Sequence, residues 1–241
     1  MDKKYYDELA DKYAQSRCVE PFVLSELMRG SEAHSIPKIL EIGCGTGVYL
    51  YAFVSVTGCQ GFGVDPSQGM LAHVVSVDNT NYANGIAECL PFQSNSFDFV
   101  YSVNVLHHIQ DIGPLFQEAM RVLKANGLIC FITDSEKMIR SREPLATYWP
   151  STIEVDLKRY HSIKSIKKQM LSVGFADIEV HEIRSPFHIH DIRPYQDKAL
   201  SCLHLISEQE YQQGLQKMKS DLIKGPVEGL SQYTCIWGYH C

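Results

Sequence analysis

The chain has 241 residues, 45% of them hydrophobic, and a formal net charge of −6. This length and apolar content suit one globular domain, and the acidic balance argues against a nucleic-acid partner, which requires a basic face. The first residues form no apolar signal segment, and no apolar run approaches the roughly 20 residues of a membrane span. The eight cysteines indicate reduced thiols in a chain of this size. We therefore expect a cytoplasmic protein with neither a nucleic-acid nor a membrane partner.

Apolar strand patterns alternate with amphipathic helical patterns along the chain. We expect a helix at 5–29, strands at about 38–43, 60–64, 81–86, 97–102, 127–133, 176–183 and 232–239, helices at about 46–56, from 67, at 112–123 and at 162–173, and helical patterning over 195–223. Strands that alternate with helices imply an α/β fold with a parallel sheet and right-handed crossovers.

A glycine-rich turn follows the first expected strand. Residues 39–47 have the sequence Ile-Leu-Glu-Ile-Gly-Cys-Gly-Thr-Gly, in which an apolar strand carrying Glu41 leads into glycines at every second position. A dinucleotide-binding turn has the spacing G-x-G-x-x-G instead. Glycine lets the backbone adopt unusual dihedral angles and approach a ligand closely. Because this turn joins a strand to a helix, it predicts a nucleotide-like ligand at the carboxyl edge of the sheet.

An acidic residue closes the second expected strand, Gly61-Phe62-Gly63-Val64-Asp65. Asp65 lies 18 positions after Gly47, close to the roughly 20-residue offset at which an acid meets ribose hydroxyls in nucleotide-binding units. A carboxylate accepts hydrogen bonds from both vicinal hydroxyls, so we expect Asp65 to hold a ribose. Pro66 suits the first turn of the following helix, and Met70 would form an apolar wall for adenine.

These motifs resemble those of the class I S-adenosylmethionine-dependent methyltransferases of the small-molecule type (methyltransferase type 11-like). Residues 85–92 and 96–102 are similar to the family pattern GDAExLPFxxxSFDxVxS, residues 106–109 to LHHI, and residues 121–127 to RVLKPGG. Ile86 departs from the pattern, because the family has an acid there. Without that acidic side chain, the contacts expected to the adenine are those of the backbone of Ala87 and Glu88.

The resemblance implies a methyl transfer from S-adenosylmethionine to a small-molecule acceptor, which gives S-adenosylhomocysteine. It also implies the residues that hold this cofactor: Tyr13, Arg17, Glu41, Gly43, Cys44, Gly45, Gly47, Asp65, Pro66, Met70, Ala87, Glu88 and Asn104. Two of them, Tyr13 and Arg17, belong to an opening similar to the family's AxxYxxxR, in which the arginine fork suits the cofactor carboxylate.

The fold implied by the resemblance is a Rossmann-like class I methyltransferase fold. It has a seven-stranded, mostly parallel sheet with helices on both faces and an antiparallel last strand inserted beside strand five. One domain would span 1–241, with an N-terminal helical lid at 1–30, an S-adenosylmethionine-binding core at 36–135 and an acceptor-side insertion at 183–230.

His107 and Asp134 are the candidate catalytic residues. They follow two neighbouring strands of the implied fold, so both would face the crevice at the carboxyl edge of the sheet. Some small-molecule O-methyltransferases with a similar LHH segment use a histidine and an aspartate at these places to deprotonate the acceptor, and histidine titrates in the right range for this. The alternative is that this segment is structural and that alignment of the reactants supplies the catalysis.

Other features leave alternatives open. His188 and His190 would share one face of an extended strand, but two histidines without a third ligand indicate an acceptor-facing loop, and we expect no metal. Phe187, Tyr195 and Trp149 could line the same pocket or pack in the core. The chain could also bind S-adenosylmethionine without transferring its methyl, or displace intramolecularly on its aminobutyrate chain. The pattern fixes neither the acceptor atom nor the oligomeric state.

Overall fold

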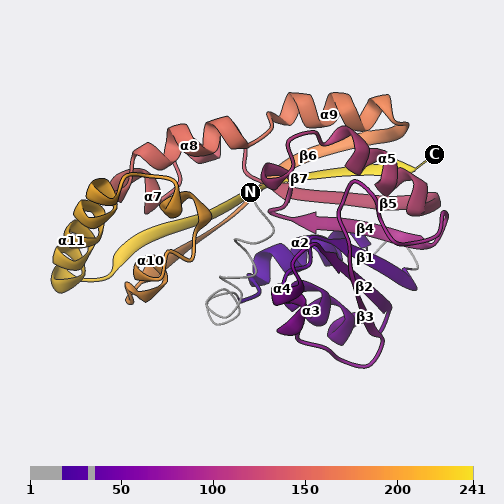
Figure 1. Cartoon of the computed structure of the whole chain (residues 1–241), viewed down its shortest axis with the longest axis horizontal. Helices are drawn as coiled ribbons and strands as arrows, with labels where there is room; N and C mark the ends of the chain where they lie inside the picture. Colours follow the sequence, from indigo (N-terminus) through magenta and orange to yellow (C-terminus); the bar gives the residue numbers. More distant parts are fainter. Residues whose placement is uncertain (1–17, 32–35, 241) are drawn as a thin grey trace.

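The computed structural model describes residues 18–31 and 36–240. The described strands form one sheet in the order β3-β2-β1-β4-β5-β7-β6 (Figure 1). They are β1 (Lys38–Ile42), β2 (Gln60–Asp65), β3 (Thr80–Asn84), β4 (Phe97–Val103), β5 (Leu123–Thr133), β6 (Phe175–Ile189) and β7 (Val227–His240). Strands β1 to β5 pair in parallel, whereas β7 lies antiparallel between β5 and β6. The predicted seven-stranded sheet and its antiparallel last strand are confirmed.

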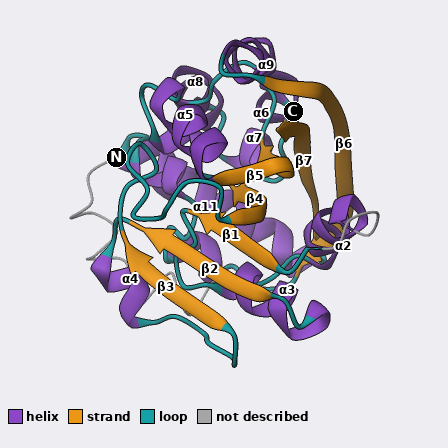
Figure 2. Cartoon of the chain, turned by 90° about the vertical axis from the view of Figure 1, so that its right-hand side faces the viewer, coloured by secondary structure: helices purple, strands orange, loops and turns teal. Residues whose placement is uncertain are grey.

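Helices lie on both faces of the twisted sheet (Figure 2). The helical elements are α2 (Pro21–Ser31), α3 (Val48–Thr57), α4 (Gln68–Ala72), η1 (Leu106–His108), α5 (Gly113–Val122), α6 (Glu136–Arg140), α7 (Leu145–Tyr148), α8 (Ser151–Arg159), α9 (Ile163–Ser172), α10 (Arg193–Gln196), η2 (Ser201–His204) and α11 (Glu208–Lys224). One face of the sheet packs against α5 and α9, and the opposite face packs against α2 and α3.

The central strands are apolar on both sides because helices cover both faces. In β4, Phe97 and Val100 face the α5–α9 layer, whereas Phe99 and Tyr101 face the α2–α3 layer. The same alternation in β5 assigns Ile129 to the first layer and its neighbours to the second. Apolar burial of this kind, at roughly 25 cal/mol per Å², is the main favourable contribution to holding the helices on the sheet.

A third hydrophobic cluster lies apart from the two sheet layers. It joins α7, α10, η2 and α11, which we call the cap, to the far ends of β6 and β7. In Figure 1 these two strands continue as a long ribbon beyond the rest of the sheet and reach the cap. The cluster centres on Trp149, whose indole Nε1 donates to the Tyr211 carbonyl over 3.0 Å and whose ring stacks on Tyr195 at 5.5 Å.

Several predicted boundaries are wrong, for local reasons. Residues 5–17 of the helix expected at 5–29 lie outside the described residues. Residues 18–20 are irregular, and the helix begins at Pro21, whose fixed φ suits a first turn. The third strand ends at Asn84, two residues early, whereas the strands expected at 176–183 and 232–239 extend to Ile189 and start at Val227. The extension arises because the two strands pair with each other beyond the sheet.

The region between β5 and α9 contains three short helices, α6 to α8, that were not predicted. Prolines interrupt the helical period here, since Pro144 and Pro150 occupy the N-cap positions of α7 and α8. The expected helical stretch at 195–223 is likewise divided into α10, η2 and α11.

A polar cluster fastens α2 to the sheet. The Glu26 carboxylate, 7% exposed, accepts hydrogen bonds from Trp237 Nε1 over 3.0 Å and from Arg29 Nη2 over 2.9 Å, and it also bonds the His181 ring. Burial raises the pKa of Glu26, but these partners outweigh it and lower the pKa overall. Glu26, His181 and Cys235 lie close enough together to resemble a metal site. The Arg29 guanidinium, however, contacts both Glu26 and His181 and so lies where a metal ion would bind. The cluster is therefore an anchor for α2.

None of the helices in the described residues combines the length and apolar character that a membrane-spanning segment needs. The cysteines of the described residues are free thiols.

The packing of α11 on α7 yields a testable prediction. A Cβ on Gly214 would lie 2.2 Å from Trp149 Nε1 and 2.5 Å from the Tyr148 carbonyl oxygen. Alanine is favoured over glycine in a helix by about 1 kcal/mol, but overpacking costs about 1–3 kcal/mol. We expect Gly214→Ala to lower the unfolding temperature. Gln213→Ala, at an exposed position on the same helix, should leave that temperature almost unchanged, and a rise in Gly214→Ala would contradict the packing described.

Candidate functional site

The glycine turn between β1 and α3 has a conformation that other residues rarely adopt. Gly43, Gly45 and Gly47 have φ angles of 71°, 53° and 74°, in the left-handed region where a Cβ is disfavoured. The space around them is also filled, because a Cβ on Gly43 would lie 2.4 Å from Val105 Cγ2 and one on Gly47 would lie 2.5 Å from the Tyr82 hydroxyl. The turn thus requires glycine for its backbone path and for its close packing.

Asp65 joins this turn to the segment after β2. Its Oδ2 accepts a hydrogen bond from the Gly45 amide over 2.8 Å, and its Oδ1 accepts one from the Ser67 amide over 2.9 Å. Pro66 lies between Asp65 and Ser67, whose side chain caps α4 by accepting from the Met70 amide over 3.1 Å. A carboxylate has about four lone-pair positions, so a group of this kind can accept from more than two donors.

Glu41 is a buried acid on the face of β1 that packs against α2 and α3. Its carboxyl group is 3% exposed and accepts a hydrogen bond from the Tyr101 hydroxyl over 3.2 Å. Burial raises the pKa of Glu41 to about 8, because an unpaired charge is costly in an apolar environment. Burial also raises the pKa of the neighbouring Cys44 thiol. Both groups are therefore neutral at pH 7.

The remaining predicted cofactor residues within the described chain lie in helix α4 and in the segment after β3. Met70 is 2% exposed and Ala87 is 9% exposed, and Ala87 and Glu88 form the centre of a tight turn closed by the Cys89 amide and the Ile86 carbonyl over 3.2 Å. Tyr13 and Arg17 lie outside the described residues.

Asn104 follows β4 with a φ of 57°. Its amide donates to the Ile132 carbonyl over 2.8 Å, which fixes it at the carboxyl end of β4. The next residue, Val105, is the one that packs against Gly43, so Asn104 lies beside the glycine turn.

A cavity of about 540 Å³ opens next to Asn104, between the sheet edge and the cap. Its lining comes from the segment before α2, the ends of β4 and β5, helices α7 and α8, the β6–β7 ribbon and the loop at 195–202. Of the predicted site residues, Asn104, His107 and Asp134 line it. Phe187 and Tyr195 do so as well, whereas Trp149 is wholly buried in the cap cluster. His188 and His190, with rings 6.5 Å apart, lie outside the lining.

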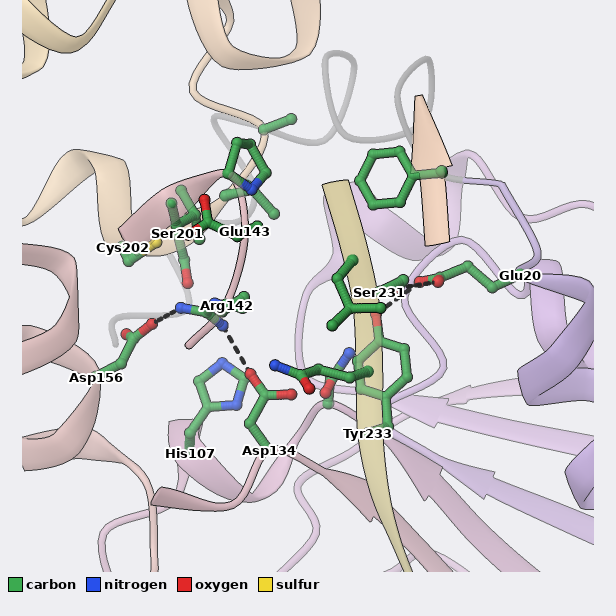
Figure 3. Close-up of a pocket in the computed structure, with 18 of the residues that line it drawn as sticks. Glu20, His107, Asp134, Arg142, Glu143, Asp156, Ser201, Cys202, Ser231 and Tyr233 are labelled. Carbon is green, nitrogen blue, oxygen red and sulfur yellow. Dashed lines mark hydrogen bonds and ion pairs between the residues drawn. The ribbon is translucent and has the colours of Figure 1, made fainter. Parts of the chain in front are cut away.

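The centre of the cavity is a buried chain of charges (Figure 3). Asp134, 3% exposed at the end of β5, accepts a hydrogen bond from Arg142 Nη1 over 2.7 Å. The other terminal nitrogen of Arg142 bonds Asp156 of α8, which also binds Arg159. Burial raises the pKa of Asp134 to about 6, although the Arg142 charge opposes this shift. The chain of charges thereby ties the sheet to α8.

His107 lies in η1, directly after β4. Its ring stacks on Tyr160 with centroids 4.2 Å apart and an angle of 8° between the planes, and it is 9% exposed. In Figure 3 His107 lies beside Asp134 below Arg142. The structure therefore brings the two predicted catalytic residues to one cavity. Sequence analysis missed the companions Arg142, Asp156 and Tyr160, which belong to the region without a predicted element.

The strand order, the glycine turn and the acid after β2 define an α/β domain built to bind a nucleotide-like cofactor at the carboxyl edge of its sheet. Residues 40–131 match the family model described as "Methyltransferase domain". The demethylmenaquinone methyltransferase of Bacillus mycoides is 28% identical over 158 residues, which cover 60% of this chain and 67% of the relative.

Solved structures have the same fold. A structure from Anabaena variabilis, assigned as a methyltransferase of an antibiotic biosynthesis pathway, has a TM-score of 0.73 and 21% identity, with coverage of 93% of this chain and 99% of the other. Phosphoethanolamine N-methyltransferase 2 of Haemonchus contortus, solved with phosphomonomethylethanolamine and S-adenosylhomocysteine, has a TM-score of 0.59 and 24% identity, with coverage of 90% and 52%. The solved structures share the Rossmann-like class I methyltransferase fold, and together with the family match they indicate a methyltransferase of the class I S-adenosylmethionine-dependent type, with S-adenosylmethionine as the supported cofactor.

The burial of Glu41 predicts a dependence of stability on pH. An acid whose pKa is higher in the folded state than in the unfolded chain contributes stability at low pH, and this contribution is lost as the pH rises from the unfolded value to the folded one. For Glu41 the window runs from 4.5 to about 8, and the loss amounts to about 5 kcal/mol at most. We expect the free energy of unfolding, measured by denaturant titration, to fall less between pH 5 and pH 8.5 in Glu41→Gln than in the wild type. If the free energies of unfolding of the two proteins fell in parallel with pH, the burial of a neutral acid would be contradicted.

Proposed function

We propose that the protein transfers the methyl group of S-adenosylmethionine to a small-molecule acceptor bound in the cavity, giving S-adenosylhomocysteine. The observation that carries the proposal is the position of this cavity, which begins at Asn104 beside the glycine turn and is enclosed by the cap. Its volume of about 540 Å³ falls within the range of roughly 300–1,000 Å³ typical of small-molecule sites. The two relatives described above are named for small molecules, demethylmenaquinone and phosphoethanolamine.

On the cofactor side, we propose that the backbone of the glycine turn lies close to the ligand and that the Asp65 carboxylate accepts hydrogen bonds from the ribose hydroxyls. Met70 would provide an apolar surface for adenine, and the turn at Ala87 and Glu88 would offer backbone groups to its edge. When bound, S-adenosylmethionine supplies a methyl on a positively charged sulfur, which a nucleophile displaces in line.

On the acceptor side, we assign the receipt of a proton to His107 or Asp134, both of which line the cavity. Alignment of the reactants alone is worth about 7–11 kcal/mol in favourable cases, and a general base adds about 10²–10⁴-fold in rate. The His107 ring stacks on Tyr160, which holds the imidazole in one orientation. A fixed ring suits His107 both as a general base and as a group that aligns the acceptor.

The cofactor assignment predicts a selective ligand. Calorimetry should show that the purified protein binds S-adenosylmethionine and binds NAD far more weakly or not at all. Asp65→Ala should weaken the binding of S-adenosylmethionine by about 1.5–3 kcal/mol, because bonds to a charged group are lost and the amides of Gly45 and Ser67 lose their acceptor. Wild-type affinity in a folded Asp65→Ala would show that the ribose assignment is wrong.

The reaction itself is tested by product analysis with methyl-labelled S-adenosylmethionine and a metabolite extract. Methyl transfer yields S-adenosylhomocysteine together with a labelled acceptor. Ring closure of the aminobutyrate chain would instead yield methylthioadenosine, and a protein that only binds the cofactor would yield neither. The appearance of either of these two results would contradict the proposed function.

If His107 is the base, His107→Ala should lower turnover about 10²–10⁴-fold with the affinity for S-adenosylmethionine within a few-fold of wild type, because a base acts on the acceptor. Activity should also fall on the acid side as the imidazole becomes protonated. His190→Ala, an exposed histidine outside the cavity, is the matched control. Unchanged turnover in His107→Ala would leave alignment of the reactants as the mechanism.

A further inference from the structure

The cavity has an acidic balance in its lining. Among the described residues that line it, the acids are Glu20, Asp134, Glu143, Asp156 and Asp197, and the bases other than histidine are Arg142, Arg159 and Lys198. Five acids face three bases, so the cavity presents a negative potential to whatever enters it.

The three bases are already engaged by other groups of the protein. Arg142 bonds Asp134 and Asp156, and Arg159 bonds Asp156 and, over 3.3 Å, the hydroxyl of Ser201. Lys198 pairs with Glu208 over 3.1 Å. A phosphate or carboxylate that binds Arg142 or Arg159 would have to displace a carboxylate that is almost fully buried, and breaking a buried ion pair is strongly unfavourable. The pair of Lys198 with Glu208 is more exposed and opposes an entering anion less.

Two buried acceptor atoms at the sheet edge have no hydrogen-bond partner. They are Oδ1 of Asp134 and Oδ1 of Asn104. Figure 3 shows that one carboxylate oxygen of Asp134 binds Arg142 while the other points away from it, toward the side of the cavity where Tyr233 lies. Buried polar atoms are rarely left without a partner in native proteins, so these two oxygens indicate a ligand with hydrogen-bond donors. Two further unpaired buried atoms are Nε of Arg142, which is a donor, and Oγ of Ser102, which can donate or accept and lies outside the cavity lining. The unpaired atoms of the lining that can only accept are therefore those of Asp134 and Asn104.

We propose that the acceptor is a neutral or cationic molecule whose N–H or O–H group donates to Asp134 Oδ1 and Asn104 Oδ1, and that the cavity excludes acceptors with a phosphate or carboxylate at this position. The inference rests on the proposed function and names its substrate class. The donor group lies beside the glycine turn, because Asn104 precedes the residue that packs on Gly43. It is therefore the group placed to accept the methyl.

The transfer then balances as follows. A protonated amine first passes a proton to Asp134 Oδ1, which frees the nitrogen lone pair, whereas a neutral acceptor passes its proton as the new bond forms. In both cases Asp134 becomes neutral, the lone pair of the acceptor forms the bond to the methyl carbon, and the electrons of the broken carbon–sulfur bond remain on sulfur. Arg142 is a positioning residue, because it holds the other oxygen of Asp134 and leaves Oδ1 directed at the acceptor, and Asp156 in turn holds Arg142.

The experiment measures binding of charge-matched probes to the protein loaded with S-adenosylhomocysteine. The pairs are phenethylamine with 3-phenylpropionate, and ethanolamine with phosphoethanolamine. We expect phenethylamine to bind at least about tenfold more tightly than 3-phenylpropionate, which corresponds to 1.4 kcal/mol. Ethanolamine should likewise bind at least about tenfold more tightly than phosphoethanolamine. Equal binding of the members, no binding of either, or preference for the anionic members by the wild type would overturn the proposal.

Variants identify the group responsible. Asp134→Asn should remove the preference for the member without an anionic group, while S-adenosylhomocysteine affinity stays within a few-fold of wild type. Asp191→Asn, at a partly exposed acid outside the cavity, should keep that preference. A preference that survives in a folded Asp134→Asn would overturn the assignment, and the wild-type comparison decides the substrate class even where this variant fails to fold. A protein that binds neither S-adenosylmethionine nor S-adenosylhomocysteine would refute the proposed function, whereas cofactor binding with a reversed probe preference would refute this inference alone.

Discussion

The carboxylate of Asp65 is shared between two chain segments that meet at the carboxyl edge of the sheet. One oxygen holds the Gly45 amide and the other holds the Ser67 amide, so a single side chain sets the glycine turn and the start of α4 relative to each other. The Val64 carbonyl adds a second constraint, because it accepts from the amides of both Gly43 and Cys44. The left-handed glycines then need no support from a ligand to keep their conformation, and a preorganised site of this kind pays little ordering cost on binding.

The cavity depends on a different constraint, the extension of β6 and β7 past the other strands. Their continued pairing from Ser185 to Ile189 carries the chain away from the sheet, and the cap folds against this ribbon around its own hydrophobic cluster. The buried charges lie where the two parts meet. Arg142 spans the junction by binding Asp134 at the sheet edge and Asp156 in α8. Packing forms the walls of the cavity, whereas this ion-pair chain determines its chemistry.

Sequence analysis predicted the sheet well, because the central strands are buried on both faces and their apolar runs are bounded by turn residues. It also predicted the members of the glycine turn and the meeting of His107 with Asp134, since parallel strands bring their carboxyl ends to one edge. It did not predict Arg142, Asp156 or Tyr160, because short helices separated by prolines carry too few turns for a periodic signal. The length of β6 and β7 was also missed. Pairing between two strands far apart in sequence leaves little trace in either strand alone.

The role of Asp65 shows another limit of the sequence. The offset from the glycine turn marks an acid at this position, but it cannot show that the carboxylate also binds two backbone amides. That dual use follows only from the approach of the turn to the start of α4. Similarly, Glu41 is a plain acidic position in the sequence, and its neutrality at pH 7 follows from burial against the α2–α3 layer.

In the described chain, none of the buried residues of the cap cluster belongs to either sheet cluster. The region that matches the methyltransferase family model ends at residue 131, before α6 begins at Glu136. The chain therefore combines a part that matches the family model with a cap that packs around a hydrophobic cluster of its own. Exchange of residues in the cap can alter the shape of the cavity while the packing of the sheet stays as it is. The walls that face a ligand in the cavity can thus vary independently of the glycine turn.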